Sequence, residues 1–238
     1  MKNYMFKVGK SIVYVGATGD VLKKLQEAAA SEGYAVKTFD TINFKESKRY
    51  NPLSYVHDSA DAECLADILI QATDAWANDP GESFVSTEKL LLRACIEYLI
   101  GHPDDLQEPN LKALEDMMIG KGDDGTDSPS HLDNLFSAIP QDSSAARLYQ
   151  SFKMAAGRTQ QSVMTSCWFR FARLSAAFMG ELTKCDELEL DKLSKEKTAL
   201  FISTFDTDVD KVIVRLLVEQ IAALNGIDEP IPARPFNH

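Results

Sequence analysis

The fold of this protein is set first by the stretch Ser11-Ile12-Val13-Tyr14-Val15-Gly16-Ala17-Thr18-Gly19-Asp20. Its first half is short, apolar and rich in β-branched residues, as expected for a buried strand, and the glycines that follow predict a turn. Apolar residues at helical spacing run from Val21 to Ser31, and Gly33 suits the left-handed position at a helix end. Ala35 to Phe39 is a second short strand. This strand–helix–strand order predicts half of a parallel α/β sheet.

A long helical region follows this first unit. Its strongest pattern, over Ser86 to Ile100, places apolar residues on one face of a helix. Similar patterns predict helices at 62–73, 110–119, 130–138, 143–156 and 159–179. After Cys185 the α/β pattern returns, with a short extended piece at Leu188–Leu190, a buried strand at Lys197–Ser203 and a helix from Asp208 to Leu224.

These patterns predict a mostly α fold, in which an all-α domain is inserted into an incomplete α/β segment with parallel strands. We assign residues 1–45 to a partial β-α-β segment, 46–186 to the all-α domain, and 187–238 to the returning strand and helix with a proline-rich tail. Three or four strands are few for a parallel sheet that is covered on both faces, so we expect a piece of a larger sheet.

The charge balance bears on the kind of partner. The 238 residues carry a formal net charge of -11, and no basic block is present. Duplex binding needs clustered Lys and Arg against the phosphates, so the acidic balance argues against non-specific DNA binding and indicates either a role in solubility or a basic protein partner. A local basic patch around Arg158, Arg170 and Arg173 is the alternative.

The cysteines and apolar runs indicate a compartment. The four cysteines form no CxxC pair, which is typical of free thiols in a reducing compartment. No signal peptide is evident, and no apolar run reaches the roughly 18 residues that span a bilayer. We therefore expect a cytoplasmic chain without a membrane segment.

Searches for phosphate-binding loops give weak matches. Gly157-Arg158-Thr159 resembles the end of a Walker A loop, but the upstream glycine is missing and a helix, not a strand, precedes it. The turn Gly16 to Asp20 has the right strand–helix context without the GxGxxG pattern. Asp206 and Asp208 follow an apolar strand, where α/β ligand sites gather, although either could instead cap the next helix.

Other catalytic and metal signatures are lacking. The four histidines show no HExxH or paired spacing, and no GxSxG sequence occurs. We therefore predict no catalytic residues and no metal site in this chain.

Three runs of the sequence resemble the VirD4-like (TraG/TraD-type) coupling proteins of bacterial conjugation and type IV secretion. They are Arg49-Tyr50-Asn51-Pro52-Leu53, the run from Tyr149 to Val163, and the run from Asp186 to Asp208. Their order and spacing carry the resemblance, which covers nearly the whole chain. It is densest around Gly157-Arg158-Thr159. The Asp-Pro-Lys-Gly-Glu turn usual in the family reads Gly16-Ala17-Thr18-Gly19-Asp20 here.

The resemblance implies a place in a larger machine. Members of this family are hexameric, membrane-anchored ATPases that pass relaxase-bound single-stranded DNA to a secretion channel. Their nucleotide domain is RecA-like and carries an inserted all-α domain implicated in docking the DNA-processing complex. It implies that the Walker A loop lies upstream of this chain and the Walker B strand downstream. ATP and Mg²⁺ are then expected only for the full-length protein, and no cofactor for this chain.

Our first hypothesis is a partner-docking module that binds a relaxase or relaxosome accessory protein, and single-stranded DNA weakly. It would act beside secretion-channel components, as a monomer or weak oligomer that hydrolyses no ATP. The resemblance places the docking surface at Gly157, Arg158, Thr159 and Ser162, where a plain helix–helix corner is the structural alternative. The positions of Thr18, Asp206 and Asp208 after predicted strands place them near the nucleotide of the full-length protein.

Two other hypotheses stay open. The chain could be a nucleotide-binding segment that completes its site in an oligomer, with Asp206 or Arg173 acting across a subunit boundary. It could also be a stand-alone acidic adaptor.

Overall fold

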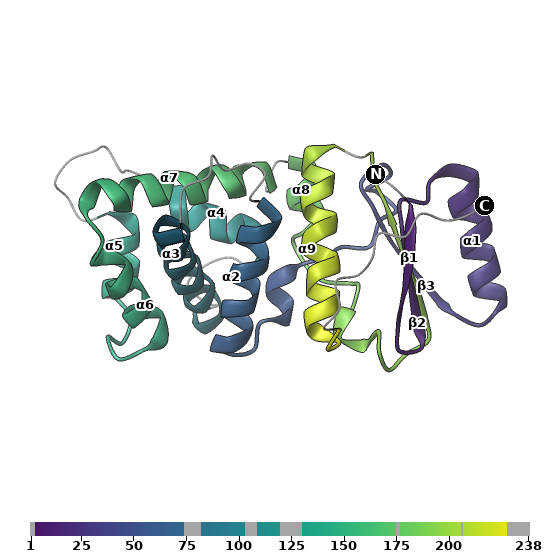
Figure 1. Ribbon diagram of the computed structural model, residues 1–238, viewed down its shortest axis with the longest axis horizontal. Coiled ribbons are helices and arrows are strands. Elements are labelled where there is room, and N and C mark those ends of the chain that lie inside the picture. The colour runs from purple at the N-terminus through teal and green to yellow at the C-terminus, as the bar shows by residue number, and fades with distance from the viewer. Residues whose placement is uncertain are drawn as a thin grey trace. The chain divides into compact units, whose positions relative to one another are not determined.

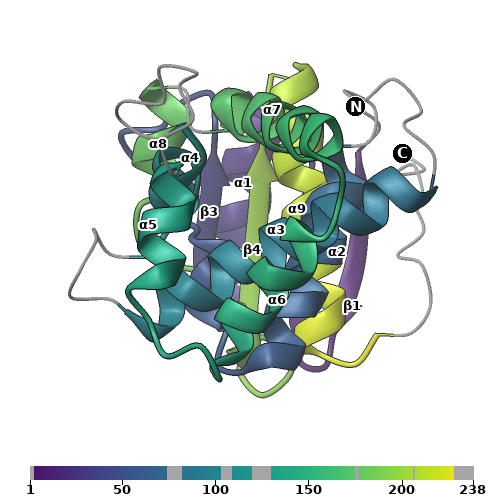
Figure 2. The same cartoon turned by 90° about the vertical axis from the view of Figure 1, so that its left-hand side faces the viewer.

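The computed structural model describes residues 3–73, 82–102, 109–119, 130–174, 177–205 and 207–227. The chain forms two compact units, one of Met1–Tyr50 with Glu181–His238 and one of Asn51–Gly180 (Figures 1 and 2). These divisions lie a few residues from the predicted boundaries at 45/46 and 186/187. That the units are the domains of a coupling protein stays a prediction. Within the described ranges no helix is both long and apolar enough to cross a membrane.

The first unit holds a four-stranded mixed sheet in the order β1-β2-β4-β3. Its strands are β1 (Tyr4–Val8), β2 (Ser11–Val15), β3 (Ala35–Asp40) and β4 (Thr198–Ser203). The pairs β2–β4 and β3–β4 are parallel, as predicted. Ile202 on β4 lies between the two neighbouring strands, opposite Val15 on β2 and opposite Phe39 on β3. The central strand β4 therefore comes from the far end of the sequence, after the whole helical region.

Strand β1 corrects the expectation of a purely parallel segment. It pairs antiparallel with β2, with Val8 opposite Ser11. Gly9, in the two-residue turn between these strands, has φ +56, a conformation that tight hairpins favour and that glycine adopts without steric cost. The sequence analysis missed β1 because half of its side chains point to solvent and only Val8 is buried.

One helix lies on each face of the sheet (Figure 1). Helix α1 (Gly19–Ser31) covers a cluster made by Ala17, Leu22 and Phe201. The ring of Tyr14 stacks on Phe201 with centroids 4.9 Å apart. Helix α9 (Asp208–Leu224), which has the predicted bounds, lies on the opposite face and buries the apolar stripe Val212, Ile213, Leu216, Leu217 and Ile221.

The segment before β4 differs from its prediction. Leu188–Leu190 was expected to be extended, but Glu189 has φ 54 and begins the short 3-10 helix η3 (Leu190–Lys192). The Glu189 carboxylate receives hydrogen bonds from Lys192 and from Lys37 on β3. These bonds, Lys192 first, lower the pKa of Glu189 to about 2. The ion pair to β3 holds the chain in a turn where a strand would leave this charge unpaired.

The described elements of the second unit are all helical. They are η1 (Pro52–Tyr55), α2 (Ser59–Thr73), α3 (Glu82–Gly101), α4 (Leu111–Ile119), α5 (His131–Ser137), α6 (Ser144–Lys153), α7 (Gly157–Leu174) and α8 (Ala177–Leu182), the last of which ends in the first unit. Asn110 caps α4, because its Oδ1 accepts from the N–H of Ala113 at 2.9 Å. The helix predicted over 159–179 ends earlier, at Leu174.

Helices α3 and α7 share a buried ion pair in the interior of the second unit. The guanidinium of Arg170 meets the carboxylate of Glu88 through Nε at 3.2 Å and Nη2 at 3.0 Å. Arg170 also donates to the hydroxyl of Thr73 at 2.8 Å. The two charged side chains are 3% and 0% exposed, so this arginine belongs to the interior rather than to a surface basic patch.

Candidate functional site

The corner between α6 and α7 carries the residues predicted to bind a partner. Gly157 begins α7, and a Cβ added there would have open space around it. Arg158 and Ser162 are exposed and Thr159 is half-buried, so the structure brings the four predicted residues together on the first turns of one helix. Gln160 fixes the corner, since its Nε2 donates to the carbonyl oxygens of Lys153 at 2.9 Å and Ala155 at 2.6 Å.

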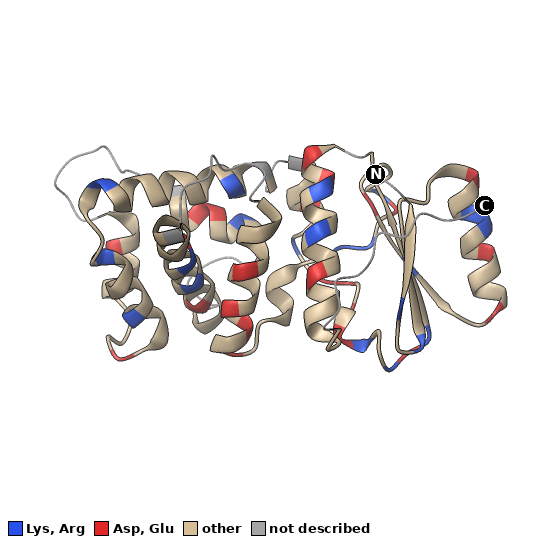
Figure 3. Ribbon diagram, in the orientation of Figure 1, with Lys and Arg blue, Asp and Glu red and all other residues tan. Residues whose placement is uncertain are grey.

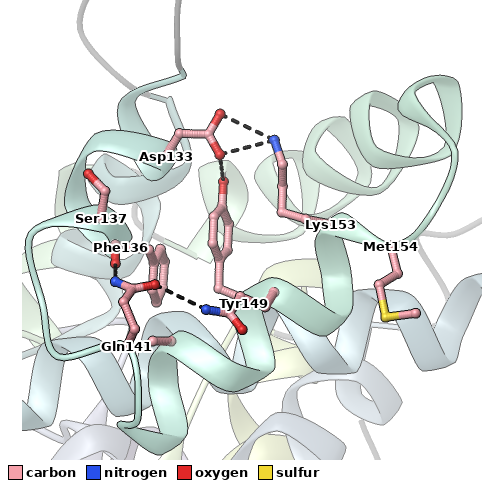
Figure 4. A pocket seen from close by; sticks show the side chains of 9 residues that line it. Asp133, Phe136, Ser137, Gln141, Tyr149, Lys153 and Met154 are labelled. Atoms are coloured by element: carbon pink, nitrogen blue, oxygen red, sulfur yellow. Dashed lines mark hydrogen bonds and ion pairs between the residues drawn. The ribbon is translucent and has the colours of Figure 1, made fainter.

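A hollow of about 330 Å³ adjoins this corner (Figure 4). We call it the α5–α6 hollow; its lining residues are Asp133, Phe136, Ser137, Gln141, Ala146, Tyr149, Gln150, Lys153 and Met154. The rings of Phe136 and Tyr149 stack with centroids 4.2 Å apart and form its aromatic side. Met154, beside the corner, is 88% exposed, which is unusual for so apolar a side chain.

A hydrogen-bond network closes one end of the hollow. The hydroxyl of Tyr149 donates to Oδ1 of Asp133 at 2.9 Å, and Nζ of Lys153 lies 3.0 Å from the same oxygen (Figure 4). Oδ2 accepts from the N–H of Ser130 at 3.1 Å, which completes the capping box of α5. Partial burial alone would raise the pKa of Asp133, but the bonds from Lys153, Tyr149 and Ser130 outweigh it and lower that pKa. Asp133 is therefore a structural carboxylate and not a proton donor at neutral pH.

The other end of the hollow is held by amides. Nε2 of Gln141 donates to the carbonyl oxygens of Phe136 and Ile139, each at 2.9 Å. Oε1 of Gln141 in turn accepts from Nε2 of Gln150 at 3.0 Å. These bonds pin the loop that follows α5 against α6, so the hollow is formed before any partner arrives.

The charge of this part of the chain is opposite to that of the whole protein. No Asp or Glu occurs from Ser143 to Gly180, whereas the same residues include Arg147, Lys153, Arg158, Arg170 and Arg173. Figure 3 shows blue and no red along α6 and the start of α7. Because Arg170 is buried against Glu88, the exposed positive charge of this stretch lies on α6 and the first turn of α7, at Arg147, Lys153 and Arg158. The side chain of Arg173 lies outside the described residues.

The residues predicted to lie near a nucleotide belong to the first unit. Thr18 precedes α1 and Asp208 begins α9, so both follow parallel strands at the carboxyl edge of the sheet. Asp206 lies outside the described residues. Asp208 is 80% exposed and pairs with Lys211 at 3.3 Å. The cap of α9 is Thr207, not an aspartate before it, and Asp210 completes the capping box.

Two backbone N–H groups at this edge are taken up within the chain. A phosphate loop needs free backbone N–H groups aimed at the ligand. Here the N–H of Gly16 donates to the carbonyl oxygen of Ile202 at 2.8 Å and so belongs to the sheet, whereas the N–H of Leu22 makes the first intrahelical bond of α1, to the carbonyl oxygen of Thr18. Gly157 and Arg158 begin a helix that follows another helix, far in sequence from any strand. Among the described residues, no group of three or more His, Cys, Asp or Glu could hold a metal ion.

The sequence analysis did not single out Asp133, Gln141 or Gln160. The pattern Ser130-His131-Leu132-Asp133 is a capping-box signal that could have marked the start of α5. No sequence signal places Gln141 or Gln160, because their partners are backbone carbonyls set by the path of the chain.

Comparison with known proteins identifies the family. Residues 3–234 match the family described as type IV secretory system conjugative DNA transfer. The chain belongs to this family. No curated protein matches it significantly.

Solved structures of coupling proteins show the same fold. The bacterial conjugative coupling protein TrwBdeltaN70, in complex with sulphate, matches with a TM-score of 0.53 at 15% sequence identity. The match covers 89% of this chain and 51% of the TrwBdeltaN70 chain. Plasmid coupling protein TrwB in complex with ADP and Mg²⁺ has a TM-score of 0.52 at 15% identity, with the same coverage of both chains. The complex of TrwB with a non-hydrolysable ATP analogue has a TM-score of 0.51 at 17% identity, covering 92% of this chain and 54% of its own. The chain therefore spans about half the length of these coupling proteins.

Proposed function

We propose that this chain serves conjugative DNA transfer as the docking part of a coupling protein, and that its helical unit is the inserted all-α domain of a RecA-like motor. Its partner is a relaxase or a relaxosome accessory protein, held for delivery to the secretion channel. The observation that carries the proposal is the pre-formed α5–α6 hollow beside the exposed corner at Gly157 and Arg158. The corner lies in the run from Tyr149 to Val163, and residues of the same run line part of the hollow. The coupling-protein resemblance is densest in this run.

The proposal assigns no ATP hydrolysis to this chain alone. The departures of both turns from a phosphate-loop sequence support this assignment: the turn Gly16 to Asp20 lacks the GxGxxG pattern, and Gly157 follows a helix and not a strand. In the proposal, ATP and Mg²⁺ belong to the full-length, hexameric protein at the cytoplasmic face of the membrane. TrwB, solved with ADP and Mg²⁺, has this fold over the shared half.

A binding measurement tests the docking function. The purified chain is titrated by calorimetry with the relaxase and with each accessory protein encoded on the same conjugative element. We expect at least one to bind and Arg158→Glu to weaken it. Lys23→Glu, on exposed α1 of the other unit, makes the same charge change and should leave binding intact. If no relaxosome protein binds the unaltered chain, the docking function is wrong.

A second candidate is a contribution to a nucleotide site completed by another subunit. It is favoured by Thr41 and Thr204, which directly follow β3 and β4 and whose buried Oγ1 atoms have no hydrogen-bond partner. Buried hydroxyls normally have a partner, and the carboxyl edge of parallel strands is where α/β proteins bind ligands.

Light scattering with and without ATP separates the two candidates, because a docking module should not change its assembly state. In the full-length protein, Thr204→Val should then leave ATP binding unchanged and raise the melting temperature. Weaker ATP binding in this isosteric variant would favour the nucleotide site.

A further inference from the structure

The α5–α6 hollow is built to receive one apolar side chain. Its wall is the stacked pair Phe136 and Tyr149, Ala146 lies on the same helix face, and the mobile thioether of Met154 stands at its edge. A volume of about 330 Å³ accommodates a side chain of leucine or phenylalanine size but no folded element. The exposed thioether can move to fit such a side chain.

The polar groups of the hollow are already committed, so charge recognition must come from its surroundings. Asp133 is satisfied by Tyr149, Lys153 and Ser130 and presents no open acceptor for a basic ligand. The ammonium group of Lys153 has three N–H donors, and its described hydrogen bonds all go to Asp133. Its charge is therefore balanced by Asp133, while it keeps the capacity to donate a further hydrogen bond. A basic partner would find no free acid at this end.

Two exposed arginines lie close in sequence to residues that line the hollow. Arg147 precedes Gln150 by three residues, one turn along α6, and Arg158 lies on the first turn of α7 just past Met154. Among the described residues neither makes an ion pair. The carboxylate of Asp142, which follows the lining residue Gln141 in the turn before α6, is exposed as well. The α6–α7 side of the hollow is thus positive, on a protein whose net charge is -11.

We propose that the α5–α6 hollow binds a short acidic peptide segment of a partner protein. An apolar side chain of the segment enters the hollow, and its carboxylates meet Arg147 and Arg158 on the α6–α7 side. The positive charge of this acid-free stretch favours an acidic occupant, and the volume of about 330 Å³ favours a single side chain of a short segment over a folded second copy of the chain. The inference rests on the proposed docking function and names the chemistry of the partner's segment.

The first test uses a defined probe. A fluorescein-labelled ten-residue peptide with a central leucine and five Asp or Glu is titrated with the whole chain, and fluorescence anisotropy gives Kd. We expect the acidic peptide to bind at least about tenfold tighter than the same peptide with Asn and Gln in place of its acids. Replacing its leucine by alanine should also weaken binding. Equal binding of acidic and neutral peptides would overturn the proposal.

Variants of the chain locate the site. Arg147→Glu and Arg158→Glu should each weaken the acidic peptide several-fold, and together at least about tenfold, while Lys23→Glu on α1 should not. Circular dichroism of each variant checks folding, and these exposed side chains have no described ion pair to lose. If Lys23→Glu has the same effect, or if an oligo-dT strand of 20 nucleotides competes for the same residues more strongly than the peptide, the assignment is wrong.

The second test separates this inference from the docking function. Overlapping 15-residue peptides from the relaxosome proteins of the same element are screened against the chain and its Arg147→Glu/Arg158→Glu variant. Binding of an acidic, leucine- or phenylalanine-containing segment that is lost in the variant supports the inference. If a whole relaxosome protein binds but its binding segment is basic, or is unaffected by the variant, docking stands and the acidic-peptide site falls.

Discussion

The buried pair of Arg170 and Glu88 allows a sharp test of how the helical unit is held together. Arg170→Met removes the guanidinium and keeps an unbranched apolar side chain of similar length. It leaves the Glu88 carboxylate, 0% exposed, without its two hydrogen bonds at 3.2 and 3.0 Å. Charged hydrogen bonds contribute about 1.5–3 kcal/mol each, and a stranded buried charge typically costs about 3–5 kcal/mol. We therefore expect the free energy of unfolding to fall by about 4 kcal/mol.

The double variant Arg170→Met/Glu88→Leu removes both charges of the buried pair. Because no charge is then left buried, it should recover most of the lost stability and be more stable than Arg170→Met alone. Urea denaturation followed by circular dichroism measures each free energy of unfolding, provided that the slopes agree. The control is Arg215→Met on α9, whose pair with Glu219 is about half exposed and should contribute about 0.5 kcal/mol or less. A loss below about 1 kcal/mol for Arg170→Met, or no recovery in the double variant, would refute the reasoning.

Three further predictions concern other parts of the chain. Asp133→Ala should destabilise the protein by about 1 kcal/mol at pH 7. Because the folded pKa of Asp133 lies below its usual 3.8, the stability that its carboxylate contributes is present above pH 3.8 and is lost as pH falls through the folded pKa. The difference in melting temperature between the variant and the wild type should therefore close towards pH 2. Burial raises the pKa of the Cys95 thiol to about 12. A thiol reagent at pH 8 should therefore modify the exposed Cys64 and spare Cys95 until the protein unfolds. Mass spectrometry of the labelled peptides shows which cysteine has reacted. Gly9→Ala should lower the free energy of unfolding, measured in urea melts, more than Gly33→Ala does. Both glycines have positive φ, but a Cβ at Gly9 would lie 2.2 Å from the Ser194 carbonyl oxygen, whereas a Cβ at Gly33 would meet nothing nearer than 4.0 Å. Equal losses of stability would show that backbone strain alone decides the cost.

The local order of the elements was readable from the sequence. Periodicity located α9 at its observed bounds and β2 and β4 within a residue, because each strand or helix carries its own apolar repeat. The family was also readable, from runs such as Tyr149 to Val163, and the family match over residues 3–234 confirms it. Strand β1 and the turn at Glu189 were not, since their conformation depends on pairing with distant residues.

The candidate site divides in the same way. The sequence by itself shows that no Asp or Glu occurs from Ser143 to Gly180 in an acidic chain, and it predicted a helix on each side of Gly157 and Arg158, with which the structure begins α7. Only the tertiary structure decided which of its arginines face water, because burial of Arg170 depends on Glu88, 82 residues earlier. The hollow itself needed Asp133 and Gln141 brought against α6, and such long-range contacts leave no periodic mark in the sequence.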